Sequence, residues 1–130
     1  MNYLSQKKGF LGYAANQDIN NKVVIVPFGL EKTVSYGGGT KHGPKEIIKA
    51  SHQVELFDEE LDKEPYKEIG IKTLKPFKIK NKISSALNQL AEINYAILLK
   101  KKLPIVLGGE HSLTIGSIRP FTKKYKNIIL

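Results

Sequence analysis

The apolar residues of this chain fall into two continuous runs and one periodic stretch. Residues 22–28 and 103–107 are runs rich in β-branched side chains that do not alternate with polar ones, which is typical of parallel strands buried on both faces. Residues 81–102 place apolar side chains three or four apart and predict a helix with one buried stripe. The stripe consists of Ile83, Leu87, Leu90, Asn94 and Ile97. A helix that leads into the second of two such strands predicts an α/β fold with a mainly parallel sheet.

Shorter elements are predicted from helix-end signals and chain breakers. Proline is favoured at the first position of a helix, so Pro44 predicts a helix over residues 45–51. Ser112 or Thr114 is expected to cap a later helix through its side chain. The other predictions are a short extended piece at residues 69–71, a helix over residues 112–118 that is disturbed at Pro120 and continues through Tyr125, and the start of a strand at residues 127–130.

The chain is expected to divide into an arm, residues 1–21, and one α/β domain, residues 22–130. The arm is polar and aperiodic except for a compact apolar patch at residues 9–13, and it should pack locally or against a partner subunit. No apolar run approaches the about 20 residues needed to span a bilayer, and the first residues lack the order of a signal peptide. We therefore expect a cytoplasmic protein with no membrane partner.

Composition and charge exclude several kinds of site and partner. The chain of 130 residues has no cysteine, which excludes disulfides, thiolate metal sites and cysteine nucleophiles. Its net charge of +9 raises the question of nucleic acid. The lysines are scattered, however, and Arg119 is the only arginine, the residue best suited to reading bases and phosphates, so no nucleic-acid partner is expected. The acidic residues concentrate in residues 54–64, which lack the spacing of a calcium loop and predict a solvated face.

A polar loop with three consecutive glycines, residues 37–39, follows the first predicted strand and leads into Pro44. Backbone N–H groups at the amino end of a helix attract negative charge, so the loop could bind a substrate or an anion, with Gly39, Lys41 and His42 as the candidate residues. The sequence favours the other interpretation, a plain flexible connection between strand and helix, because the pattern matches neither the phosphate-loop nor the dinucleotide fingerprint. The sequence leaves both interpretations open.

The second predicted strand runs directly into Gly108, Gly109, Glu110, His111 and Ser112. Open α/β sheets bind ligands at the carboxyl ends of their strands, so His111 is placed where a functional side chain is expected. A single histidine at this position can be a hydrogen-bonded structural residue. Next to Glu110, which can orient it, it can also be a metal ligand with a supporting carboxylate. One histidine is too few for a metal centre, and the chain offers no convincing second set of ligands.

These residues resemble the ureohydrolase family, which includes arginase, agmatinase and formiminoglutamase. Residues 108–114 are similar to the family's first metal motif, in the form with glutamate that is more typical of agmatinase-like members. The resemblance extends over roughly residues 20–130. It includes the first strand, the loop at residues 39–44 with its helix, residues 54–58, residues 70–74 and the long helix before the histidine.

The resemblance implies an arginase-like, three-layer α/β/α sandwich, which this chain would form only in part as a truncated version. It implies two manganese ions (Mn2+) that share a hydroxide, which attacks a guanidino substrate such as agmatine and releases urea and putrescine, a step of polyamine biosynthesis. His111 would be one metal ligand, and Glu110 would be a neighbouring acid that supports His111 without binding the metal itself. The family also implies a homo-oligomer, a trimer or a hexamer.

The family's other ligands lie in an Asp-x-His-x-Asp motif and in a later Asp-x-Asp motif, and neither motif occurs in these 130 residues. The chain by itself is therefore expected to be inactive. The alternative is a non-catalytic remnant or interaction module that binds a partner subunit or an anion through residues 36–44.

Overall fold

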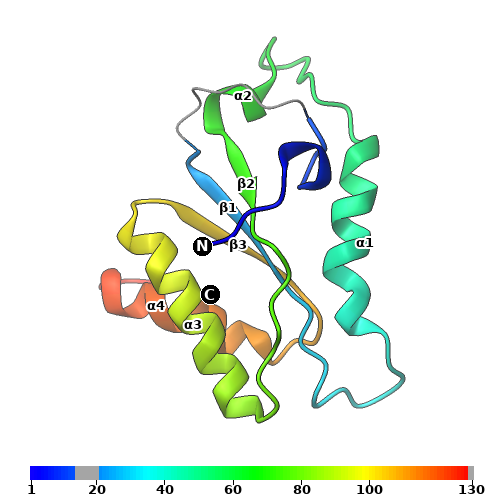
Figure 1. Ribbon diagram of the computed structural model, residues 1–130. Helices are drawn as coiled ribbons and strands as arrows, with labels where there is room; N and C mark the ends of the chain where they lie inside the picture. Colours follow the sequence, from blue (N-terminus) through cyan, green and yellow to red (C-terminus); the bar gives the residue numbers. More distant parts are fainter. Residues whose placement is uncertain (14–20, 129–130) are drawn as a thin grey trace.

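A computed structural model describes residues 1–13 and 21–128 of the chain. Its centre is a sheet of three parallel strands, β1 (Val23–Phe28), β2 (Ile71–Thr73) and β3 (Leu103–Gly108), in the order β2-β1-β3 (Figure 1). The predicted parallel sheet is thereby confirmed. The extended piece predicted at residues 69–71 lies too early, because Ile69 still ends a helix and Gly70 turns the chain at φ 63°.

Helices cover both faces of the sheet, which confirms the partial α/β/α sandwich. The helix α1 (Gly43–Ala50) lies on one side, and α3 (Ile83–Leu99) and α4 (Leu113–Lys124) lie on the other (Figure 1). The remaining helical elements are α2 (Pro65–Ile69) and the short 3-10 turns Gln6–Lys8, Thr40–His42 and Ser51–Gln53.

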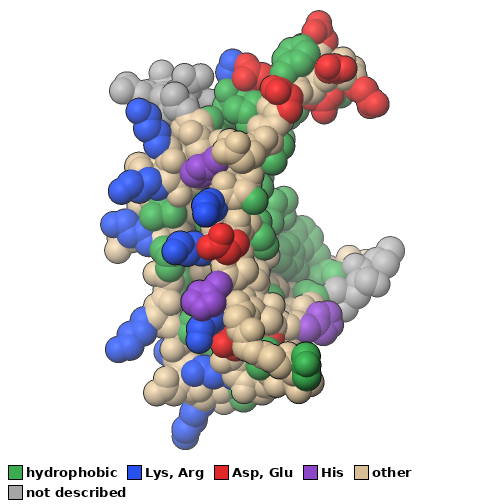
Figure 2. All heavy atoms as spheres, turned by 90° about the vertical axis from the view of Figure 1, so that its right-hand side faces the viewer, with side chains coloured by type: hydrophobic (Ala, Val, Ile, Leu, Met, Phe, Trp, Pro, Cys, Tyr) green, Lys and Arg blue, Asp and Glu red, His purple; other side chains and the backbone are tan. Residues whose placement is uncertain are grey.

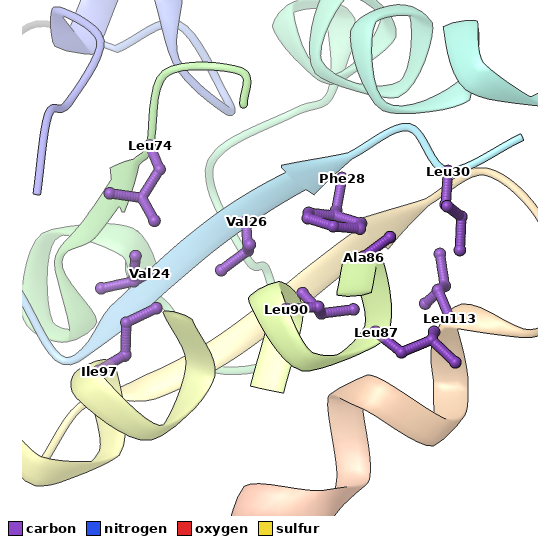
Figure 3. Packing of buried hydrophobic residues seen from close by; sticks show 10 residues of the cluster. All are labelled: Val24, Val26, Phe28, Leu30, Leu74, Ala86, Leu87, Leu90, Ile97 and Leu113. Atoms are coloured by element: carbon purple, nitrogen blue, oxygen red, sulfur yellow. The ribbon is translucent and has the colours of Figure 1, made fainter. Parts of the chain in front are cut away.

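The core lies between β1 and α3. Side chains of α3 point at alternate residues of β1, and Leu113 at the start of α4 joins them (Figure 3). The buried members of this cluster are Val24, Val26, Phe28, Leu30, Leu74, Ala86, Leu87, Leu90, Ile97 and Leu113. The stripe predicted from the helical periodicity is confirmed for all its members except Ile83, which is only partly buried. Asn94 in the same stripe is buried against α4 and donates to the carbonyl of Ser117 at 3.3 Å.

Helices α3 and α4 approach each other closely because of Gly116. A Cβ atom on Gly116 would lie 2.7 Å from the carbonyl oxygen of Leu87, so only glycine allows the two backbones to come so near.

Pro120, predicted to disturb α4, lies inside a helix that continues to Lys124. The helix predicted over residues 81–102 is shorter, since it ends at Leu99 and Lys101 adopts a left-handed turn at φ 57°.

Strand β3 differs from its prediction. It was expected to be buried on both faces, but Leu103 is 49% exposed and Ile105 is 42% exposed, while Val106 packs against the core. The physical reason is position: β3 is an edge strand, and within the described residues one of its faces is incompletely covered. A strand was predicted at residues 127–130, but residues 127–128 do not form one. Ile129 and Leu130 lie outside the described residues.

The first thirteen residues pack along the opposite edge of the sheet, next to β2. Tyr3 forms an antiparallel bridge with Leu74, and the N–H of Leu4 donates to the carbonyl of Thr73 at 2.8 Å. The buried Tyr13 donates its hydroxyl hydrogen to the carbonyl of Ile71 at 2.8 Å. Residues 1–13 thus pack locally, which is one of the two arrangements expected for the arm. Residues 14–20 lie outside the described residues, and the domain boundary at residue 21 stays a prediction.

The acidic segment, residues 54–64, projects from one end of the molecule. Asp58 and Lys63 form an isolated antiparallel bridge at its tip, and Figure 2 shows acidic side chains gathered at this end while lysines are spread over the rest of the face with α1. Within residues 1–13 and 21–128, no helix combines the length and the apolar composition that a membrane crossing requires.

Candidate functional site

The carboxyl ends of β1 and β3 lie side by side and continue together beyond the sheet. Phe28 is in register with Gly108, and two residues further the N–H of Glu110 donates to the carbonyl of Leu30 at 2.9 Å. A Cβ atom on Gly109 would lie 2.1 Å from that carbonyl oxygen, so this approach requires glycine. The segment with His111 therefore lies directly against the start of the loop that joins β1 to α1, residues 29–42, which we call the β1–α1 loop.

Glu110 connects the two segments through its side chain. It is 6% exposed, and its carboxylate accepts four hydrogen bonds, from the N–H groups of Lys32 (2.5 Å) and Thr33 (2.8 Å) and from the hydroxyls of Thr33 and Ser112 (both 2.6 Å). Burial by itself raises the pKa of this carboxyl, but the four donors outweigh it and hold the pKa at about 2. Glu110 is therefore charged at neutral pH and fixes the near end of the loop.

The side-chain cap predicted for α4 is wrong. Ser112 precedes the helix, but its hydroxyl donates to Glu110 and no side-chain capping bond is formed. The backbone explains the difference: Ser112 has φ −57° and ψ −22°, which is helical, whereas a capping residue has an extended backbone that brings its side-chain oxygen to the following N–H groups. The serine thus supports the acid in front of His111 and does not support the helix behind it.

A second acid, Glu31, fixes the far end of the loop. Its Oε2 accepts the N–H groups of Gly39 (2.5 Å) and Lys41 (3.2 Å) and the hydroxyl of Thr40 (3.1 Å), and its Oε1 lies 3.3 Å from the ammonium of Lys41. The backbone donors of Lys41 and Gly39 hold the pKa of Glu31 at about 2. Glu31 was not predicted from the sequence. The available signal was an acid between the end of a strand and a run of glycines whose N–H groups need an acceptor.

The far end of the loop also folds back onto the sheet. A Cβ atom on Gly29 would lie 2.2 Å from the carbonyl oxygen of Lys41, and one on Gly43 would lie 3.0 Å from the carbonyl oxygen of Gly108. Gly39 has φ 115°, a conformation that other residues rarely adopt. Glycines at these positions allow the loop to pass over the end of β1 and reach β3.

The three candidate residues of the loop lie together in or beside the 3-10 turn Thr40–His42. Gly39 precedes this turn, Lys41 is exposed but paired with Glu31, and His42 is exposed. The N–H groups of Gly39 and Lys41, which an anion would need, already donate to Glu31. This observation disfavours the interpretation of the loop as an anion site, and it disfavours a plain flexible connection for the same reason.

His111 lies at this edge with an exposed side chain, in the turn that leads into α4. Among the described residues, no group of three or more His, Cys, Asp or Glu side chains is close enough to hold a metal ion. The oxygens of Glu110 are already occupied by four donors, so Glu110 is not available as a further ligand beside His111. The residues present therefore do not fit a complete metal centre by themselves.

His111 lines neither of two cavities among the described residues that are large enough to take a small molecule. The larger, about 390 Å³, lies between α3 and the carboxyl half of α4, with Arg119 in its wall. The smaller, about 290 Å³, lies beside the β1–α1 loop and is lined in part by Gly29, Lys41 and Lys45. Only the second adjoins the candidate site.

Comparison of the sequence with known proteins gives a consistent result. The model of the arginase family matches residues 21–130. The chain is 34% identical over 102 residues to N(1)-aminopropylagmatine ureohydrolase of Synechocystis sp., which covers 75% of this chain and 33% of that protein. It is 31% identical over 114 residues to agmatinase of Bacillus cereus, which covers 85% of this chain and 38% of that protein.

Comparison of the structure gives the same result. Agmatine ureohydrolase of Thermoplasma volcanium superimposes with a TM-score of 0.67 at 27% identity, over 77% of this chain and 34% of that one. Arginase of Bacillus subtilis superimposes with a TM-score of 0.62 at 26% identity, over 83% of this chain and 36% of that one. The chain thus spans about a third of the length of the relatives it matches.

Proposed function

The chain belongs to the arginase family, and from this premise we propose that it supplies the first metal-ligand segment of an agmatinase-type ureohydrolase. Such an enzyme hydrolyses the guanidino group of agmatine to urea and putrescine. The observation that carries the proposal is the match of residues 21–130 to the family, with relatives named for ureohydrolase activity on agmatine or aminopropylagmatine. Since the chain spans about a third of those relatives, the proposed activity is that of a complete enzyme.

We propose that His111 is the metal ligand of this segment and that the metal is manganese, as the family resemblance implies. The exposed imidazole is free to bind, and Glu110 holds the turn in front of it through the hydrogen bonds to Lys32 and Thr33. Because no group of three or more His, Cys, Asp or Glu side chains lies together among the described residues, they cannot hold a metal centre by themselves and no catalytic step is assigned to them. Their contribution is to present one imidazole at a fixed place on the edge of the sheet.

The β1–α1 loop is proposed as part of the substrate site, with Gly39, Lys41 and His42 facing a guanidino compound. The alternative of an interaction module that binds an anion here is weaker, because Glu31 occupies the N–H groups that the anion would need. A trimeric or hexameric assembly is an expectation that comes from the family resemblance, and a cytoplasmic location stays an expectation from the sequence.

The chain of 130 residues alone is expected to be inactive, since one imidazole cannot hold two metal ions. Purified chain is incubated with Mn2+ and agmatine, and urea is measured against a metal-free control. No urea above the control is expected. Metal-dependent urea release by this chain would contradict the assignment of the missing ligands to sequence outside it.

The activity itself is tested in a complete enzyme that contains this sequence. With Mn2+ it is expected to release urea from agmatine or from aminopropylagmatine, and comparing the two substrates decides between the activities named in the relatives. His111→Ala should lower the rate by about 100-fold or more, because losing a ligand costs at least as much as losing a supporting residue. His52→Ala, whose ring bonds the carbonyl of Gly9, is the matched control and should stay active. Full activity of His111→Ala would refute the ligand role.

A further inference from the structure

We infer that Glu31 is a positioning residue, which fixes the far end of the β1–α1 loop and thereby places Lys41 and His42 at the edge of the sheet that carries His111. Its meaning for catalysis rests on the proposed function, because these are the residues assigned to the substrate site. The fixing of the loop does not depend on that function, and it is argued from the contacts of Glu31 alone.

The contacts of Glu31 are organised around the loop backbone. Two N–H groups, of Gly39 and Lys41, converge on the same oxygen, Oε2, at 2.5 and 3.2 Å. They converge because Gly39 has φ 115°, which turns its peptide so that successive N–H groups face one point. The side chain of Glu31 is 14% exposed, whereas the residues that donate to it lie at the surface. One side chain thus occupies the place of the anion that such a turn would otherwise bind.

The loop is held at two separate points. Glu110 binds the N–H groups of Lys32 and Thr33, and Glu31 binds those of Gly39 and Lys41. Between the two points Tyr36 is 99% exposed, and a Cβ atom on Gly37 would touch nothing within 4 Å. Loss of Glu31 should therefore release the far end of the loop and leave the end held by Glu110 in place.

The simplest alternative is that Glu31 only forms a surface ion pair with Lys41, at 3.3 Å. Exposed ion pairs contribute little, whereas hydrogen bonds from N–H groups to a charged carboxylate are among the stronger ones. Lys41→Met removes the ion pair but keeps both backbone hydrogen bonds. Glu31→Ala removes the ion pair and the backbone hydrogen bonds together. The two variants therefore separate the explanations.

Amide hydrogen exchange, resolved by residue in the chain of 130 residues, tests the inference. In Glu31→Ala, the amides of Gly39 and Lys41 should exchange about tenfold faster, the effect of losing one charged hydrogen bond each, while those of Lys32 and Thr33 stay within about twofold. Lys41→Met should change Gly39 by less than about threefold. Glu31→Gln, which keeps an acceptor of the same shape, should restore part of the protection.

Glu68→Ala is the matched control, because Glu68 also pairs with a lysine, Lys63, at 3.2 Å, and no backbone N–H group of the described residues donates to it. It should leave the loop unchanged. Unchanged exchange at Gly39 and Lys41 in Glu31→Ala would overturn the inference. Faster exchange throughout the chain, α3 included, would also overturn it, since Glu31 would then act on global stability and not on the loop.

The ring resonances of the three histidines give a second readout. Glu31→Ala should shift the signals of His42, which follows Lys41, and leave those of His52 in place; shifts of both or of neither would count against a local role. In a complete enzyme the same variant should raise KM for agmatine while kcat stays within about twofold. If that enzyme releases no urea at all, the proposed function fails and the exchange result still decides the role of Glu31.

Discussion

The helical layer, formed by α3 and α4 against β1, and the β1–α1 loop are held together by opposite means. The layer consists of fully buried apolar side chains such as Val26, Leu90 and Ile97, and its one buried amide, Asn94, lies at the crossing with α4. The loop has no apolar core of its own, and two carboxylates, Glu31 and Glu110, bind its N–H groups.

The difference separates two properties of the molecule. Apolar burial contributes to the free energy of unfolding of the whole domain, whereas the carboxylates decide where one loop lies. A site that must hold particular side chains at an edge requires the second kind of interaction, because hydrogen bonds fix direction and apolar contacts do not. The expected effects of mutations should therefore be large and global in the layer, and small and local in the loop.

The largest effect is expected for Leu90→Ala. Leu90 is 0% exposed at the centre of the layer, and truncation should lower the free energy of unfolding by about 3–4 kcal/mol through lost burial and the cavity left behind. Leu99→Ala is the same change at a residue 67% exposed, and it should cost less than about 0.5 kcal/mol. Urea denaturation followed by circular dichroism measures both. Equal costs would mean that the layer is not the main source of stability.

A smaller effect is expected for Gly109→Ala, which acts where the layer and the loop meet. The added Cβ would lie 2.1 Å from the carbonyl oxygen of Leu30, so β3 must move away from the loop at a cost of about 2 kcal/mol. Gly38→Ala is the control, because its Cβ would meet nothing nearer than 3.7 Å and its φ is ordinary. The same denaturation experiment compares them; a neutral Gly109→Ala would show that the close approach is not required.

Acid should loosen the loop before the layer. The pKa of Glu31 is about 2 in the folded chain, below its ordinary value of 4.5, so the contribution of Glu31 is fully present above pH 4.5 and is lost as the pH falls towards 2. The amide resonances of Gly39 and Lys41 should therefore move with a midpoint near pH 2, and Glu31→Gln should abolish this transition. A midpoint near 4.5 would mean that the carboxylate is not engaged.

The smallest effect on stability is expected for His111→Ala. The ring is exposed, so the free energy of unfolding should change by less than about 0.5 kcal/mol. Unchanged stability together with a large loss of activity in a complete enzyme would show that His111 serves the functional site and not the fold. Strong destabilisation would instead make His111 a structural residue, the interpretation that the sequence left open.

Prediction from the sequence succeeded for the elements whose structure one physical rule decides. Continuous apolar runs gave the strands around Val26 and Val106, and periodicity gave the buried stripe with Leu90. Its errors came from features of the fold that a local pattern does not contain. Ile105 is apolar like a buried residue but lies on an edge strand, and Ser112 is a residue type that caps helices but has a helical backbone in this turn.

The candidate site was predicted in part for the same reason. Residues 108–112 are contiguous, so the motif around His111 could be recognised and placed after a strand. The role of Glu31 depends on a loop that folds back and presents Gly39 and Lys41 to it, which requires Gly29 to lie under the backbone of Lys41. That arrangement follows from tertiary packing and has no periodic signature in the sequence.

The order of the strands also affects how the chain folds. β1 is made first but lies in the middle of the sheet, where Val23 pairs with Ile71 on one side and with Leu103 on the other. During synthesis β1 is therefore made before either of its partner strands, and non-local strand pairing of this kind is slow. The early strand is exposed to aggregation until β3 leaves the ribosome, and folding yield should respond to anything that delays residues 103–108.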